Sequence, residues 1–79
     1  MRQIDYSEEA KSYFLDNYPY TFDLLIRIEE LKFIGDRILP DNCIPLTSNY
    51  YWWEVLEHAI IFRQVNAQTL YIASIKPLV

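Results

Sequence analysis

The sequence predicts an α+β fold, with two helices near the N-terminus packed on one face of a small, mainly antiparallel sheet. Two patterns carry this prediction: apolar residues recur at helical spacing in the first half of the chain, whereas the second half alternates as strands do. The length is a third observation. A chain of 79 residues with 52% hydrophobic content can build the core of one domain, spanning residues 1–79.

The N-terminal residues predict a short strand followed by a helix. Residues 2–7, "RQIDYS", alternate weakly over a length that suits a first strand. We expect Ser7 to cap the helix that follows, because its hydroxyl can accept from free backbone N–H groups. Glu8 and Glu9 then lie at the positive end of the helix dipole. Pro19 would end this helix, since it disfavours the α conformation of the residue before it.

A second helix is expected to begin at Thr21, whose hydroxyl can cap it. The stretch "FDLLIRIEELKFI" places Leu24, Leu25, Ile28 and Leu31 along one buried stripe, with its charged residues mostly outward. About three residues separate the two helices, so they should lie as an antiparallel hairpin.

The remainder of the chain predicts a loop and then a three-stranded antiparallel meander. Residues 35–49 carry prolines, Asp, Asn and Ser, which are typical of a loop, with a short extended piece at residues 44–46. The expected strands and turns are, in order, residues 50–55, 56–57, 58–65, 66–68 and 69–76. We expect the first strand of the chain to join the sheet beside one of these later strands.

Strand alternation divides the side chains of the meander between a core face and an opposite face. A two-residue turn at Leu56-Glu57 would place Val55 opposite His58, and cross-strand partners share a face. The core face would carry Tyr51, Trp53, Val55, His58, Ile60, Phe62, Leu70, Ile72 and Ser74. The opposite face would carry Tyr50, Trp52, Glu54, Ala59, Ile61, Arg63, Val65, Thr69, Tyr71, Ala73 and Ile75.

The opposite face holds the candidate partner-binding residues Tyr50, Trp52, Arg63 and Tyr71. The guanidinium of Arg63 would lie between the two tyrosine rings and stack on them. Both predicted helices are used on the core face, so the opposite face predicts contact with a protein partner or a second copy, unless a loop or the C-terminal segment covers it. Stacking on single-stranded nucleic acid is an alternative, although a net charge of −4 disfavours phosphate binding.

Cysteine, histidine and glycine usage gives no reason to expect a metal or a cofactor. Cys43 and His58 are each the only residue of their type, and a metal site needs several converging ligands. A single glycine also cannot build a phosphate-binding loop. We therefore expect no cofactor and no metal. The lone cysteine, and the lack of a leader or a long apolar run, predict a cytoplasmic protein without membrane contact.

The order of the expected elements resembles the RelE/ParE toxin superfamily of bacterial type II toxin–antitoxin systems. The stretches "HAIIFRQVNAQTLYIASIKP" and "IDYSEEAKSYF" are similar to the closing strands and the N-terminus of that superfamily. The resemblance implies a divergent toxin, or a toxin-derived relative that is no longer toxic, bound by an antitoxin protein. DNA gyrase, or messenger RNA on the ribosome, would be its target.

The resemblance also implies where a ribonuclease site would lie, because such members offset transition-state charge with cations on the sheet. The lysine positions of the superfamily fall on or near Tyr50 and Trp52, and an arginine position falls on Ala59; none of the three is basic. The remaining catalytic candidates are Arg63, Lys76 and Tyr71. The sequence leaves open a partner-binding toxin relative, a ribosome-dependent endoribonuclease with a non-standard site, and an interaction module unrelated to toxins.

Overall fold

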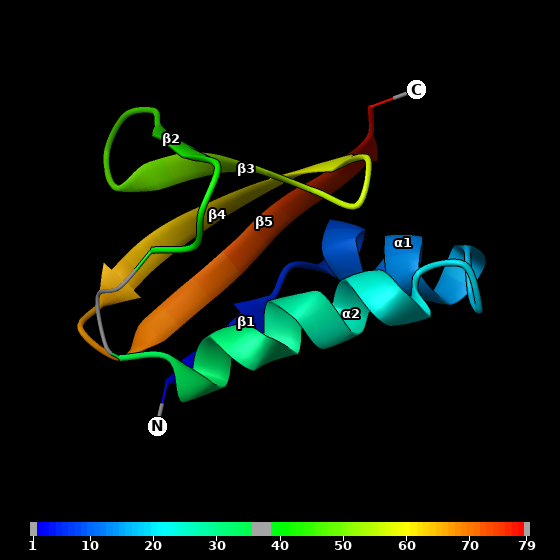
Figure 1. Ribbon diagram of the computed structural model, residues 1–79, viewed down its shortest axis with the longest axis horizontal. Coiled ribbons are helices and arrows are strands. Elements are labelled where there is room, and N and C mark those ends of the chain that lie inside the picture. The colour runs from blue at the N-terminus through cyan, green and yellow to red at the C-terminus, as the bar shows by residue number, and fades with distance from the viewer. Residues whose placement is uncertain (1, 36–38, 79) are drawn as a thin grey trace.

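The computed structural model describes residues 2–35 and 39–78, and the predicted α+β class is confirmed (Figure 1). In chain order the elements are β1 (Gln3–Tyr6), α1 (Glu8–Asp16), α2 (Phe22–Glu29), the 3₁₀ helix η1 (Glu30–Phe33), β2 (Cys43–Pro45), β3 (Tyr50–Val55), β4 (His58–Asn66) and β5 (Thr69–Pro77). Both α-helices lie on one side of the sheet (Figure 1). Residues 36–38 of the predicted loop, and residues 1 and 79 of the predicted domain, lie outside the described part.

The five-stranded sheet is mainly antiparallel, as predicted, and the first strand joins it as expected, through one parallel pair. Its five strands follow the order β1-β5-β4-β3-β2, with β1 parallel to β5 and every other neighbouring pair antiparallel. β2 adds a strand at one edge, where Ile44 pairs with Trp52. β1 forms the other edge, where Ile4 pairs with Leu70. The predicted three-stranded meander therefore describes only part of the sheet.

A residue with a hydroxyl side chain precedes each α-helix, but only Ser7 caps its helix as predicted. The Ser7 oxygen accepts the backbone N–H of Ala10 at 3.1 Å, and the same hydroxyl donates to the carbonyl of Ala73 at 2.7 Å. The Thr21 hydroxyl instead donates to the carbonyl of Phe14 at 3.1 Å. Thr21 therefore ties the start of α2 to α1, whereas Ser7 caps α1 and fastens it to β5.

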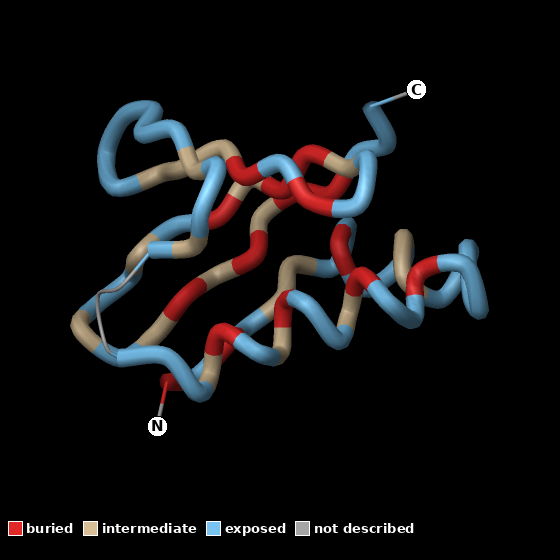
Figure 2. Tube along the Cα trace, in the orientation of Figure 1, coloured by how far each residue is buried: buried red, intermediate tan, exposed pale blue. Residues whose placement is uncertain are grey.

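The core lies between the helices and the sheet, where buried segments of both face each other (Figure 2). Its buried members are Ile4, Ala10, Leu24, Ile28, Leu31, Trp53, Val55, Ile60, Phe62, Leu70, Ile72 and Ile75. The predicted stripe on the second helix is confirmed for Leu24, Ile28 and Leu31, whereas Leu25 is only half-buried. Removal of this apolar surface from water is the main stabilising contribution to the fold.

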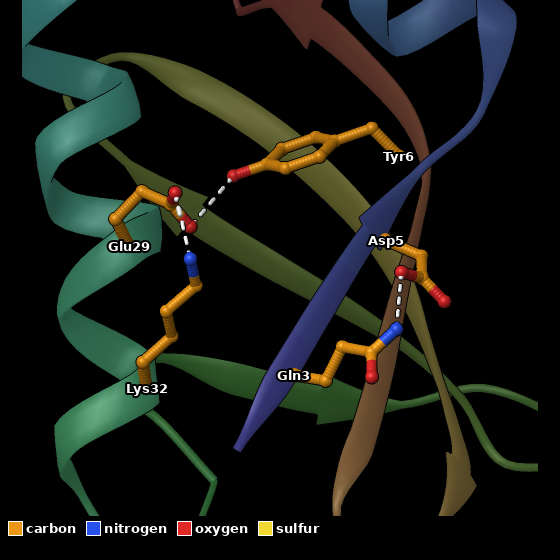
Figure 3. Close-up of polar contacts among 5 residues, drawn as sticks. All are labelled: Gln3, Asp5, Tyr6, Glu29 and Lys32. Carbon is orange, nitrogen blue, oxygen red and sulfur yellow. Dashed lines mark hydrogen bonds and ion pairs between the residues drawn. The ribbon is translucent and has the colours of Figure 1, made fainter. Parts of the chain in front are cut away.

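A polar chain joins α2 to β1 (Figure 3). The Tyr6 hydroxyl donates to Oε2 of Glu29 at 3.1 Å, and Nζ of Lys32 donates to Oε1 of the same carboxylate at 3.1 Å. Burial, together with the negative charge of Glu29, raises the pKa of the Tyr6 phenol far above its ordinary value. Tyr6 therefore remains a protonated donor. Gln3 and Asp5, which alternate with Tyr6 along β1, form a separate hydrogen bond of 2.9 Å.

The alternation of β5 reverses at Ala73. Ile72 pairs with Phe62, whereas Ser74 pairs with Ile61, so Ala73 is an extra residue between two consecutive pairs. An insertion of this kind is a β-bulge, which sends the residues beyond it to the faces opposite those that simple alternation predicts.

The bulge corrects the predicted faces of three residues. Ser74 was predicted on the core face and Ile75 on the opposite face; in the structure they exchange places, and Ala73, also predicted on the opposite face, is the bulge residue itself. Ile75 pairs with Ile60 and is 4% exposed. The extra residue thus lets β5 bury an isoleucine in place of a serine.

Candidate functional site

The face of the sheet opposite the helices, called the open face from here on, carries Tyr50, Trp52, Glu54, Ala59, Ile61, Arg63, Tyr71, Ser74 and Lys76. Its register follows from the turn at Leu56-Glu57, which has the predicted length because Val55 pairs with His58. Both turn residues have positive φ, at 49° and 59°, as in the type I′ turns that suit the twist of antiparallel strands. The predicted faces are therefore confirmed for β3 and for residues 58–63 of β4, whereas Val65, predicted on the opposite face, lies at a register irregularity between Gln64 and Asn66.

Arg63 lies within a row of side chains that crosses the sheet. It pairs with Tyr50 on β3 and with Tyr71 on β5, and Tyr71 in turn pairs with Asp5 on β1. The guanidinium carbon of Arg63 is 5.8 Å from the centroid of the Tyr50 ring, within the range of a cation–π contact. The predicted stacking is confirmed for Tyr50, and Tyr71 is the cross-strand neighbour on the other side.

Trp52 belongs to an apolar row next to the Arg63 row. It pairs with Ile61 on β4 and with Ile44 on β2, and Ile61 pairs with Ser74 on β5. Ile44 is 56% exposed, while Trp52 and Ile61 are half-buried. The open face therefore presents apolar surface over three neighbouring strands beside a cation.

Lys76 lies apart from Arg63, in a third row. It pairs with Ala59, which in turn pairs with Glu54. Ala59 precedes Arg63 by four residues on β4, so the two rows are separated by roughly 13 Å at about 3.3 Å per residue. Arg63 and Lys76 are therefore not adjacent, and Glu54 adds an opposite charge to the row of Lys76.

The guanidinium of Arg63 keeps its hydrogen-bonding capacity for a partner. Arg63 is exposed, and within residues 2–35 and 39–78 its guanidinium takes part in no hydrogen bond and no ion pair. A guanidinium offers five N–H donors in a planar arrangement that suits a carboxylate. Contact with the Tyr50 ring restricts where those donors can point, so Arg63 is a partly preorganised anion-binding group.

Ser74 is the residue of the open face that sequence reasoning missed. It is 9% exposed, and its Oγ has no hydrogen-bond partner among the described residues. A signal for its position was present in the sequence. The predicted register placed a polar hydroxyl, that of Ser74, in the core and an apolar side chain, that of Ile75, on the opposite face. One extra residue in β5 exchanges the two faces and so removes both mismatches.

His58 and Cys43 occupy separate structural positions. The Nδ1 of His58 lies 2.8 Å from the carbonyl oxygen of Leu56, which can only accept, so Nδ1 carries the proton and Nε2 accepts from the Tyr13 hydroxyl at 2.7 Å. Cys43 pairs with Trp53 across β2 and β3, and burial raises the pKa of its thiol. Their contacts are those of structural residues.

Residues 2–35 and 39–78 contain neither a cluster of metal-ligating side chains nor a helix able to cross a membrane. No group of three or more His, Cys, Asp or Glu side chains gathers there as ligands for an ion. No helix of that part of the chain has the length and apolar character needed to cross a membrane.

No protein-family model matches the chain, and no curated protein is significantly similar to it.

Proposed function

We propose that this protein is the toxin component of a bacterial type II toxin–antitoxin pair, or a toxin-derived relative without toxicity, and that it acts by binding a protein through its open face. The observation that carries the proposal is the row in which the exposed Arg63 lies between Tyr50 and Tyr71, next to Trp52. Arginine, tyrosine and tryptophan are the residues that most often dominate the binding energy of protein interfaces.

The order of the elements supports the toxin assignment. The chain runs through a strand, two helices and then the antiparallel strands β3, β4 and β5, and β1 lies beside β5. This is the arrangement that the resemblance to the RelE/ParE superfamily leads us to expect. An antitoxin is accordingly the first partner we propose, with DNA gyrase or the ribosome as the target.

The chemistry of the open face indicates what the partner presents to it. A guanidinium flanked by aromatic rings recognises a carboxylate by paired hydrogen bonds. The neighbouring row of Ile44, Trp52 and Ile61 accepts apolar side chains. We therefore expect the partner to contribute an acidic residue to Arg63 and apolar residues to the row beside it.

The spacing of the cations favours protein binding over RNA cleavage. An endoribonuclease on this face would need Arg63 and Lys76 to act on one scissile phosphate. Their rows are separated by roughly 13 Å along β4, and Lys76 shares its row with Glu54. Protein binding needs no such convergence of positive charge.

Growth of a bacterial culture during induced expression tests the proposal. The wild type is compared with Arg63→Ala and Trp52→Ala, and Lys11→Ala serves as the control because Lys11 is an exposed cation of α1, away from the open face. We expect the wild type and the control to arrest growth and the two open-face variants to relieve the arrest. Circular dichroism of each purified variant shows whether it is folded.

One result would narrow the proposal, and another would contradict it. Normal growth with abundant folded wild-type protein would show that the protein is not an active toxin and would leave only the version of the proposal in which it is a non-toxic relative. Arrest of equal strength by all variants would show that toxicity does not act through the open face. Where growth stops, assays of gyrase supercoiling and of message cleavage on ribosomes distinguish the two targets.

A further inference from the structure

A second apolar surface lies on the side of α2 and η1 that is turned away from the sheet. Phe22, Ile26 and Phe33 are 51%, 44% and 79% exposed, respectively. Their spacings of four and seven residues align them along the helix, opposite the buried Leu24 and Ile28. We call these three residues the outer stripe. The sequence prediction, which turned mainly charged residues outward here, did not identify it.

The outer stripe departs from the usual character of a surface helix. An amphipathic helix buries one apolar face and turns its polar residues to water, whereas α2 is apolar on both its inner and its outward side. With large side chains about half or more exposed, the outer stripe presents on the order of 300 Å² of apolar surface. Exposed apolar patches of a few hundred Å² are often functional, so the outer stripe is a candidate contact site.

The flank of the outer stripe is acidic. A groove of about 580 Å³ runs beside α2, and its lining includes Glu30, Asp41 and Glu54. Arg27 is the single cation among the described residues that line it, and Arg27 already lies 3.6 Å from Glu30. Asp23, one helical turn before Arg27, adds a further exposed carboxylate to the same flank.

We infer that the outer stripe and the acidic groove beside it dock an amphipathic helix of a protein partner that carries Lys or Arg along one flank. A helix laid along α2 would align its own apolar residues, spaced at i, i+4 and i+11, with the outer stripe. The negative charge of this flank determines which binding partners fit the surface. It repels a second copy of this chain, whose net charge is −4, and it repels an anionic membrane surface.

The outer stripe shares no residue with the open face, and the groove beside it shares only Glu54 with the residues named for that face. The outer stripe lies on the outward side of the helical layer, whereas the open face is the far side of the sheet. Both surfaces can therefore be occupied at the same time, and the inference goes beyond the function proposed above.

A pair of synthetic peptides tests the inference on the full-length protein. The first is a fluorescein-labelled amphipathic helix of about 14 residues, with leucines spaced to match the outer stripe and lysines along one flank. The second carries glutamates in place of the lysines. By fluorescence anisotropy we expect the lysine peptide to bind at least about tenfold more tightly than the glutamate peptide, with the difference shrinking as salt is added.

Variants of the protein locate the binding surface. Phe33→Ser removes exposed apolar area and should weaken binding of the lysine peptide roughly tenfold. Val65→Ser, at a similarly apolar and exposed position on β4, is the matched control and should have no effect. Glu30→Lys should weaken binding of the lysine peptide and strengthen binding of the glutamate peptide. Circular dichroism verifies that each variant is folded.

Three outcomes would overturn the inference. The first is equal binding of the two peptides, and the second is binding of the lysine peptide that Phe33→Ser leaves unchanged. The third is a dimer in sedimentation equilibrium that Phe33→Ser dissociates, which would assign the outer stripe to a second copy of the chain.

Discussion

The serine that begins α1 gives a stability prediction that can be worked from two bonds. Ser7 accepts the N–H of Ala10 at 3.1 Å and donates to the carbonyl of Ala73 at 2.7 Å. Ser7→Ala removes both bonds at once. Loss of a helix cap costs about 1 kcal/mol, and loss of the second hydrogen bond costs about 1 kcal/mol more. We therefore expect the free energy of unfolding to fall by about 2 kcal/mol.

Urea denaturation followed by circular dichroism measures this change, and thermal denaturation gives a second estimate. For a domain of this size the melting temperature should fall by roughly 10 °C. Ser12→Ala is the matched control, because Ser12 is an exposed serine within the same helix; it should alter the free energy of unfolding by less than about 0.5 kcal/mol. Ser7→Thr keeps the hydroxyl and should retain most of the stability.

The hydrogen bond from the Ser7 hydroxyl to the Ala73 carbonyl connects the stability of α1 to the shape of the open face. Ala73 is the bulge residue that turns Ser74 and Lys76 toward that face. Ser7→Ala should therefore also speed amide hydrogen exchange at the bulge, which Ser12→Ala should not do. Equal destabilisation by Ser7→Ala and Ser12→Ala would refute the reasoning, since it would mean that neither bond contributes.

Two further stability predictions concern buried hydroxyl groups. Tyr6→Phe removes the hydrogen bond to Glu29 and should lower the free energy of unfolding at neutral pH by about 1 kcal/mol in urea titrations. Because the pKa of Tyr6 is raised in the folded protein, the contribution of Tyr6 to wild-type stability should be constant below the ordinary phenol pKa of about 10 and fall as the pH rises above it. The fall in overall stability should be shallower in Tyr6→Phe, and a residual slope is expected from Tyr13, whose pKa burial also raises; parallel slopes in the two proteins would contradict the assignment. Ser74→Ala removes a buried hydroxyl that has no partner among the described residues and should leave stability unchanged or raise it by up to about 1 kcal/mol; a clear loss in the same titration would contradict this account.

The pairing within the open face could be predicted because local rules determine it. A two-residue turn at Leu56-Glu57 leaves one register between β3 and β4, and alternation then assigns the paired side chains of these two strands to a face. For this reason Tyr50 and Arg63 could be placed side by side from the sequence, and the structure pairs them. Neither step required knowledge of how the helices pack.

The bulge at Ala73 could not be predicted from alternation, because Ile72 and Ile75 are equally apolar and suit either register. The registers with and without the extra residue differ in which of Ser74 and Ile75 faces the core. What favours the bulged form is tertiary, including the bond from Ser7, which is 66 residues away from Ala73 in the chain. No local pattern contains that contact.

The outer stripe escaped prediction because α2 is apolar around most of its circumference. Leu24 and Ile28 form one apolar line, and Phe22 and Ile26 form another on the opposite side. Helical periodicity identifies both lines but does not say which of them meets the sheet. Only the packing of the whole domain makes that choice, and the line left outside becomes visible as a surface.

The central claim, that the open face binds a protein partner, is tested most directly by photo-crosslinking in growing bacteria. A photoreactive phenylalanine analogue replaces Trp52 in one culture and Tyr20, which is 91% exposed and lies outside the open face, in another. We expect a discrete protein adduct from position 52 that Arg63→Ala strongly reduces, and little adduct from position 20. Absence of an adduct at position 52, or the same adduct at equal yield from both positions, would contradict the claim.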